Sequence, residues 1–247
     1  MSSKIDVREL HEWLRNEIGR NQSSTLAHGY QANVRLYRTP FGTVVVKSPH
    51  RASLKGLIGR ATIKHEHEVY NRLQGIGGIP HCFGLIDGEH LVLEYIEGAS
   101  LRRQPRLEDP NGFYARLLST LQQMHRAGVA HGDLKRKDNL IVGAGEQPYI
   151  VDFGIAAVRP ESRWGLRAIR FRLTEQLDNN AWIKLKYGRR AEAISPEDLE
   201  LYRPLWIERI ARWLRIGWQN ATLRRPRQRW RKRREAARAA EGKESER

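Results

Sequence analysis

Two polar sequences in the middle of the chain contain side chains that could hold a divalent metal and activate a hydroxyl group. HGDLKRKDNLIV occupies residues 131–142, and YIVDFGIA occupies residues 149–156. Asp133 could orient or deprotonate a hydroxyl, while Asn139 and Asp152 offer the hard oxygen ligands that Mg²⁺ prefers. A base and metal ligands of this kind, combined with cations, are what phosphoryl transfer requires of a protein.

Short apolar runs beside both motifs predict strands that would hold these side chains rigidly. The runs are Leu140–Val142 and Tyr149–Val151. Upstream, residues 33–47 predict two strands around a turn at Gly42, and residues 91–97 predict a buried strand. The spacing of apolar residues predicts helices at 1–20, 60–74 and 111–127.

The order of these elements predicts an α+β protein with two lobes. Strands and a helix come first, and most of the remaining chain is expected to be helical. We expect a small β-rich N-lobe over residues 1–97 and a mainly helical C-lobe over residues 98–222. A basic C-terminal tail is expected over residues 223–247.

These motifs resemble those of the protein-kinase superfamily, and they follow its order from about residue 27 to residue 157. The resemblance implies an ATP-dependent enzyme that uses Mg²⁺. Lys47, at the end of VVVK, would hold the α- and β-phosphates, and Lys135 would lie near the transferred phosphate. The backbone of LVLEY at Glu94 and Ile96 would meet adenine. The apolar contacts of the nucleotide would come from Val34, Val45, Leu93 and Leu140.

The resemblance also implies an acidic partner for Lys47 on the following helix, for which Glu66 and Glu68 compete. Glu66 shares a helical face with Val69 and Tyr70, so it should point toward the packed side of the helix. Glu68 lies on a different face. We therefore favour Glu66 as the partner of Lys47.

A phosphate-binding loop is expected at residues 27–34, AHGYQANV, where Gly29 and Ala32 would approach the nucleotide. The family pattern is matched only with alanine in two glycine positions, although Gly29 lies at a suitable distance of 18 residues before Lys47. Alanine restricts φ more than glycine does, so we expect a stiffer loop than in typical kinases.

The spacing inside the first motif departs from the family pattern by one residue. Asn139 follows Asp133 by six residues, where the pattern has five, so Asp138 occupies the expected metal position. We favour Asn139, because Leu-Ile-Val follows it in strand register and Asp152 lies 13 residues further on. The choice between Asp138 and Asn139 stays open at this point.

Two further departures, together with the short length, argue against an ordinary regulated eukaryotic protein kinase. Gly132 replaces the usual arginine, so activation through a phosphate captured there is not expected. Ser195-Pro196-Glu197 superficially resembles the Ala-Pro-Glu that closes an activation loop. We interpret it instead as a helix start, with Ser195 as N-cap and Pro196 in the first turn.

The composition indicates a reducing compartment and phosphate-rich partners. The chain has one cysteine, Cys82, and no apolar N-terminal segment typical of a secretory signal. The formal net charge is +16, and residues 160–247 hold 23 Lys/Arg against 12 Asp/Glu. Such a charge favours nucleotides, nucleic acid, anionic lipid or phosphorylated glycolipid as partners. We expect a cytoplasmic protein, with peripheral membrane contact left open.

The short length, the HGD motif and the basic, Trp-rich C-terminal part resemble the bacterial lipopolysaccharide core kinases, the Kdo and heptose kinase family. LIGRATIKHEHEVYNRLQGIGGIP and LDNNAWIKLKY carry this likeness. It implies an acceptor hydroxyl on a lipid-anchored oligosaccharide at the inner membrane face. The alternatives are a RIO-like protein kinase and a kinase-fold scaffold without activity. The helical pattern of Tyr202–Trp218 and the tail leave contact with lipid or RNA open.

Overall fold

The computed structural model describes residues 6–20, 24–28, 32–49, 54–103, 106–188 and 194–203. Met1–Tyr202 form one compact unit, and Arg203–Arg247 form another. Nearly all of the second unit lies outside the described residues, together with most of the helix expected at 202–218 and all of the basic tail expected at 223–247. All the helices and strands named below belong to the first unit.

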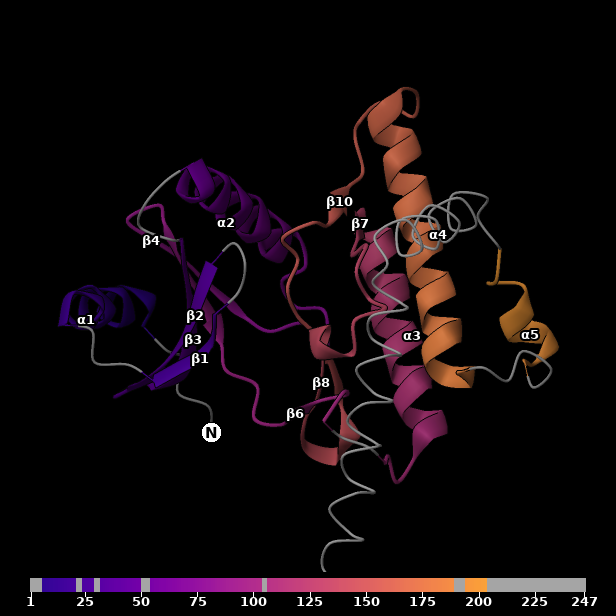
Figure 1. The fold of residues 1–247 in the computed structure, drawn as a ribbon, viewed down its shortest axis with the longest axis horizontal. Helices are drawn as coiled ribbons and strands as arrows, with labels where there is room; N and C mark the ends of the chain where they lie inside the picture. The colour runs from indigo at the N-terminus through magenta and orange to yellow at the C-terminus, as the bar shows by residue number, and fades with distance from the viewer. Residues whose placement is uncertain are drawn as a thin grey trace, which may run out of the picture. The chain divides into compact units, whose positions relative to one another are not determined.

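An antiparallel sheet dominates the N-terminal half of this unit (Figure 1), with the strand order β1-β2-β3-β5-β4. Its strands are β1 (Ser24–His28), β2 (Ala32–Thr39), β3 (Gly42–Pro49), β4 (Cys82–Ile86) and β5 (His90–Glu94). The turn between β2 and β3 falls at Gly42, as expected, with φ at +125°. The β1–β2 hairpin brackets Gly29, which lies outside the described residues together with the side chain of Ala32.

Alternating side chains of the sheet pack on two different helices. Val44, Val46 and Val92 join Leu10 and Leu14 of α1 (Val7–Arg20) in one apolar cluster. The intervening residues face the other way. In β3 and β5 these are Val45, Leu91 and Leu93, which join the cluster of α2 (Leu54–Arg72). The alternation expected of strands therefore gives the sheet one face covered by α1 and a second face toward α2.

The chain leaves the sheet three residues earlier than the sequence predicted. The strand expected at 91–97 ends at Glu94, because Tyr95–Glu97 have no strand partner, and the residues after it run to the short β6 (Ala99–Ser100). β6 pairs with β8 (Leu140–Val142), which pairs with β9 (Pro148–Ile150). The helix expected at 60–74 also begins earlier, at Leu54.

Helices make up most of the C-terminal half of the unit. They are α3 (Pro110–Arg126), α4 (Leu166–Tyr187) and the short α5 (Pro196–Leu199), with β7 (Val129–Ala130) and β10 (Ala157–Val158) forming a small ladder. α3 and α4 pack side by side (Figure 1), and the buried Trp182 indole of α4 donates to the Tyr114 carbonyl of α3 at 2.9 Å. Asp109 caps α3 by accepting from Gly112 N.

The turn after α2 fastens the N-terminal half of the unit to the helices. The Gly77 carbonyl accepts from Thr120 Oγ1 of α3 at 2.9 Å, and the Gly78 carbonyl accepts from Ile150 N at 2.8 Å. Gly78 has φ at +85°, and a Cβ there would lie 2.8 Å from the Pro148 carbonyl oxygen. Only glycine fits this turn without strain, so its position beside β9 is fixed by the sequence.

Candidate active site

Lys47 lies at the centre of a cluster of charged groups contributed by three separate segments. Its Nζ lies 2.5 Å from Glu66 Oε1 on α2 and 3.3 Å from Asp152 Oδ1 of the DFG sequence. Burial lowers the pKa of Lys47, but the two carboxylates outweigh it, and the net pKa is raised above its ordinary value. The charged ammonium is therefore stabilised in this site.

Glu66, rather than Glu68, faces the lysine. Its side chain is buried, whereas Glu68 is exposed. Glu66 Oε1 also accepts from the Phe153 backbone N–H at 3.2 Å. One carboxylate oxygen thus joins the lysine of β3 to the backbone of the DFG sequence.

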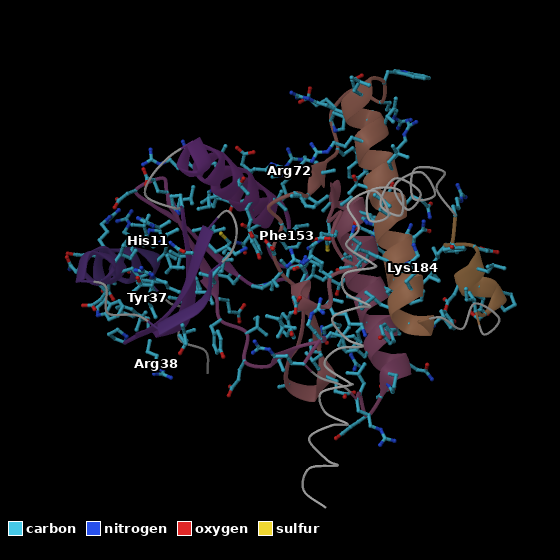
Figure 2. All side chains as sticks on the ribbon, in the orientation of Figure 1. His11, Tyr37, Arg38, Arg72, Phe153 and Lys184 are labelled. Atoms are coloured by element: carbon cyan, nitrogen blue, oxygen red, sulfur yellow. The ribbon has the colours of Figure 1, made fainter. Side chains whose placement is uncertain are left out.

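Phe153 packs between two rings from different elements. Its ring centroid lies 5.0 Å from that of Tyr70 on α2, edge to face, and 5.0 Å from that of His131. Figure 2 shows Phe153 in the region between α2 and the helices α3 and α4. The position of α2, and hence of Glu66, is coupled through this stack to the loop that carries Asp133.

His131 has a structural role in the candidate catalytic loop, residues 131–139, which carries Asp133. Its Nδ1 accepts from Asp133 N at 3.1 Å, and its Nε2 lies 3.1 Å from the Val151 carbonyl oxygen. A backbone N–H must donate, so Nδ1 is unprotonated and Nε2 carries the hydrogen. The ring thereby links the loop before Asp133 to the residue before Asp152.

Asp178 in the middle of α4 holds the same loop, and sequence reasoning missed it. Its carboxylate accepts from His131 N at 2.6 Å and from Gly132 N at 2.8 Å, and it contacts His125 Nε2 at 3.2 Å. Asp178 is buried. The polar run Asp-Asn-Asn directly before the apolar residues Ala181–Ile183 was the available signal, since a buried carboxylate needs partners.

Gly132 adopts a backbone conformation that an arginine in its place would not readily take. Its φ is +81°, and a Cβ would lie 3.2 Å from Thr174 Cγ2 of α4. The close approach of the loop to α4 therefore explains glycine in the middle of HGD.

Asn139 and Asp138 have different surroundings. Asn139 is buried, and its Nδ2 donates to the Asp133 carbonyl at 3.1 Å, which leaves Oδ1 directed elsewhere. Asp138 is exposed and pairs with Arg102 Nε at 2.8 Å through both carboxylate oxygens. The extra residue of the motif is accommodated by the 3₁₀ turn Lys137–Asn139, which turns Asp138 outward.

Asn139 and Asp152 are adjacent through the pairing of β8 with β9. The Asn139 carbonyl accepts from Val151 N at 3.0 Å. Asp152 has φ at +72°, a left-handed conformation that non-glycine residues seldom adopt. Lys47 holds the pKa of the Asp152 carboxyl below its ordinary value, although burial opposes this. An ionised carboxylate and an oriented amide oxygen fit Mg²⁺. The described residues contain no group of three His, Cys, Asp or Glu that could hold a metal.

Asp133 lies in the same loop and remains partly accessible. Its side chain is 18% exposed, and its Oδ2 lies 3.6 Å from Arg136 Nη1. Lys135 is exposed. A carboxylate that is held at its backbone but open at its oxygens can accept a proton from an approaching hydroxyl.

Three of the residues expected to meet adenine, Val34, Val45 and Leu93, share one face of the sheet. Val34 is the register partner of Lys47, and Val45 is the partner of Leu93, so these side chains point the same way. Glu94 N donates to the His81 carbonyl at 2.8 Å, so this backbone N–H is already bonded. Ile96 and Leu140 are buried, and Leu140 belongs to the same apolar cluster as Leu93.

Comparisons with known proteins relate part of the chain to protein kinases. No family model matches the chain. The chain is 36% identical over 112 residues to the serine/threonine-protein kinase PknE of Mycobacterium tuberculosis, which covers 42% of this chain and 20% of PknE. It is 30% identical over 129 residues to PknH of Mycobacterium bovis, covering 49% of this chain and 22% of PknH.

A solved structure is similar over most of the chain. The Rio2 kinase–ADP/Mg²⁺–phosphoaspartate complex from Chaetomium thermophilum has a TM-score of 0.50 at 13% identity, covering 76% of this chain and 63% of that chain. The chain has a protein-kinase-like fold. The predicted α+β class is thereby confirmed, and so is the broad resemblance to the protein-kinase-like superfamily.

Within this protein-kinase-like fold, the segment after DFG is short. Residues 153–165, 13 in number, connect Asp152 to the start of α4. Ser195 accepts from Asp198 N, and Pro196 begins α5, so Ser-Pro-Glu is a helix start as predicted. The chain spans only about a fifth of the length of PknE and PknH.

Proposed function

We propose that the chain is an ATP-dependent phosphotransferase that moves the γ-phosphate of ATP to a hydroxyl group. The observation that carries the proposal is the pairing of Lys47 with both Glu66 and Asp152, beside a loop that holds Asp133 and Asn139. Lys47 is largely buried between two carboxylates, and one of them, Asp152, has a left-handed backbone conformation. Burying charge is costly, and clusters of perturbed charged groups of this kind are typical of functional sites.

Each residue has a proposed role in the transfer. Lys47 binds the α- and β-phosphates, and Glu66 holds Lys47 in place. Asn139 and Asp152 would hold Mg²⁺, which neutralises phosphate charge when it is bound. Asp133 accepts the proton of the acceptor hydroxyl. The hydroxyl oxygen bonds to the γ-phosphorus, and the bond between the γ-phosphorus and the oxygen that leaves with ADP breaks. Lys135 would stabilise the transferred phosphate.

The adenine site is proposed on the sheet face that carries Lys47. Val34, Val45, Leu93 and Leu140 would enclose the base. The Glu94 N–H is bonded to His81, so we assign adenine contacts to the Glu94 carbonyl and to the backbone of Ile96. Gly29 and Ala32 would cover the phosphates from the β1–β2 hairpin.

For the acceptor, we propose a sugar hydroxyl of lipopolysaccharide core at the cytoplasmic face of the membrane. The short segment 153–165 supports a non-peptide acceptor, since it offers little chain to form a peptide platform. No described helix is long and apolar enough to span a membrane. A RIO-like serine/threonine protein kinase is the second candidate, and the likeness to the Rio2 kinase structure favours it.

A transfer assay with radiolabelled ATP tests both proposals. Lipopolysaccharide core, a protein acceptor and the chain itself should be compared as acceptors under equal conditions. Asp133→Asn should lose at least about a hundredfold in transfer while retaining nucleotide binding. Asp138→Asn is the matched control and should stay active, because Asp138 faces outward to Arg102. Nucleotide binding without transfer to any acceptor would instead indicate a kinase-fold scaffold. Full activity of Asp133→Asn would refute the assigned base.

A further inference from the structure

The start of α4 presents large apolar side chains to solvent beside the DFG segment. Trp164 is 86% exposed, Leu166 is 85% exposed, and Ile169 is 52% exposed. Ile155, two residues after Phe153, is also 52% exposed. Single exposed apolar residues are ordinary, but three within six residues, one of them a tryptophan, indicate an interaction site.

The helix that carries these exposed side chains is packed on its inner side. Ala168 and Phe171 are buried, and Phe171 clusters with Ala130 and Ala157 of the small β7–β10 ladder. Leu166 and Ile169, three residues apart, lie on the outer side of the helix. In Figure 1 the first turns of α4 extend beyond the neighbouring α3. The apolar side chains thus project from a firmly packed helix end.

The loop that carries Trp164 is also held in place. Ser162 Oγ donates to the Trp164 carbonyl and accepts from Trp164 N, both at 3.2 Å. The Arg163 carbonyl accepts from Arg172 Nη2 at 3.2 Å. Trp164 is therefore exposed although its backbone is held by hydrogen bonds. Its exposure follows from an ordered loop conformation.

Positive charge surrounds these apolar side chains. Residues 159–172 contain five arginines and one acid, Glu161. Arg163, Arg167 and Arg170 are exposed around Trp164, Leu166 and Ile169. Apolar side chains including tryptophan, bordered by arginine, match the boundary between acyl chains and anionic headgroups. A protein partner would need an acidic apolar surface, whereas an anionic bilayer supplies both chemistries at once.

The same surface is connected to the catalytic loop. Arg170 Nη2 donates to the Ile155 carbonyl at 3.3 Å. Thr174, one turn further along α4, lies against Gly132 beside Asp133. The helix that would contact the membrane at its start therefore also contacts the DFG segment and the loop that carries Asp133.

We propose that Trp164, Leu166 and Ile169, with the surrounding arginines Arg163, Arg167 and Arg170, form the α4 tip, a surface that docks the chain on an anionic lipid bilayer. The apolar side chains enter the headgroup region while the arginines contact lipid phosphates. The delivery of a lipid-borne acceptor to Asp133 rests on the proposed function, but the docking itself does not.

Vesicle binding by the full chain, measured without ATP, tests the α4 tip. Vesicles of phosphatidylcholine alone are compared with vesicles that also contain phosphatidylglycerol, using sedimentation. The double variant Trp164→Ser/Leu166→Ser should reduce partitioning onto phosphatidylglycerol vesicles by at least about tenfold. Leu199→Ser is the matched control, because Leu199 on α5 is 53% exposed and lies outside the tip. It should bind as the unaltered chain does.

The charge contribution is tested separately. Arg163→Gln and Arg167→Gln should each reduce partitioning by about fivefold on phosphatidylglycerol vesicles and leave binding to phosphatidylcholine unchanged. A fluorophore on Leu166→Cys should report an apolar environment only with phosphatidylglycerol vesicles. The single native cysteine, Cys82, is buried and should not be labelled.

Three outcomes would overturn the proposal. The first is vesicle binding by Trp164→Ser/Leu166→Ser equal to that of the unaltered chain, which would assign binding to the basic C-terminal sequence. The second is no preference of the unaltered chain for phosphatidylglycerol. The third is loss of transfer to a protein acceptor in this variant without vesicles, which would make the tip a protein-docking surface. Failure of the kinase proposal is distinct, because it shows as absent phosphate transfer while vesicle binding persists.

Discussion

Glu66 illustrates how a single carboxylate can couple two parts of a site. It contacts Lys47 at 2.5 Å and accepts from Phe153 N at 3.2 Å. Glu66→Ala removes both contacts and leaves Lys47 with Asp152 alone. We expect kcat to fall about a hundredfold, since positioned charge is what phosphoryl transfer depends on. Steady-state kinetics with varied ATP will measure this.

Glu68→Ala is the control for Glu66→Ala. Glu68 lies two residues away on the same helix and is exposed. Its removal should change kcat less than about twofold, as is usual for surface substitutions. If kcat falls equally in Glu66→Ala and Glu68→Ala, the loss comes from a general disturbance of α2, and Glu66 does not position Lys47.

The extra residue in the catalytic loop makes Asn139 and Asp138 a natural pair for comparison. Asn139→Ala should weaken Mg²⁺-dependent nucleotide binding about tenfold or more, because this variant lacks the buried side-chain amide that we propose as a Mg²⁺ ligand. Asp138→Ala removes only an exposed pair with Arg102 and should leave Mg²⁺ affinity unchanged. Calorimetric titration of Mg²⁺ with the nucleotide present will distinguish them. If Asp138→Ala weakens Mg²⁺ affinity more than Asn139→Ala does, Asp138 is the metal ligand.

Cys82 gives a pH-dependent test of packing around the β4–β5 strands. Burial raises the pKa of its thiol to about 11, so at pH 8 the folded chain should hold it protonated and alkylate very slowly. The unfolded thiol titrates near its ordinary value of 9.0. Because the folded pKa is the higher one, the contribution of this thiol to stability is lost as the pH rises from about 9 to about 11. Iodoacetamide labelling with and without urea will compare the alkylation rates of the unfolded and the folded thiol. The variant Cys82→Ala gives the background labelling.

At the scale of elements, hydrophobic periodicity predicted α1, α3 and the strands around Lys47, because each of these has a clear apolar pattern. Boundaries were less predictable. β5 ends at Glu94 because its next residues lack a strand partner, and no local pattern in LVLEYIE shows this. The short ladders β6–β8 and β7–β10 were not predicted, since they depend on pairing between distant segments.

The site residues were more predictable than the helix that supports them. Lys47, Asp133 and Asp152 lie in motifs whose order can be read along the chain, and Glu66 followed from its helical face. Asp178 belongs to no such motif. Its role depends on α4 passing beside the catalytic loop, which only the three-dimensional arrangement reveals.

Asp178→Ala tests whether α4 positions the catalytic loop. The variant leaves the His131 and Gly132 backbone N–H groups without their acceptor in a buried place. We expect a loss of about 3 kcal/mol in the free energy of unfolding, since unsatisfied buried donors cost about 1–3 kcal/mol each and partial compensation is usual. Urea unfolding will measure it.

Asn179→Ala serves as the control on the neighbouring position of α4 and should cost less than about 1 kcal/mol. Asp178→Asn keeps one acceptor oxygen and should be intermediate. If Asp178→Ala is as stable as Asn179→Ala, the loop is held by His131 and its own turn, and α4 contributes only packing.

At the scale of the whole molecule, charge and fold have separate roles. The chain carries a formal net charge of +16, and residues 224–234 contribute eight basic residues without an acid. Charge of this kind governs the encounter with anionic partners and is separate from the charged groups around Lys47. In the site itself, Lys47 is paired with the two carboxylates of Glu66 and Asp152, so this cluster carries no excess positive charge. Polyanion binding and nucleotide binding should therefore respond differently to salt.

Deletion of residues 224–247 tests this separation, because it removes 11 basic and 4 acidic residues and lowers the formal net charge from +16 to +9. Nucleotide affinity should stay within about twofold, whereas anionic vesicle or RNA binding should weaken. The slope of log affinity against log salt should fall by about 0.7–0.9 for each phosphate that the tail neutralises in the unaltered chain. Vesicles and RNA compared at equal salt will identify the partner. An unchanged slope would show that the tail binds no polyanion. Vesicle binding that survives the deletion at high salt should then depend on Trp164 and Leu166, since apolar insertion is not screened by ions.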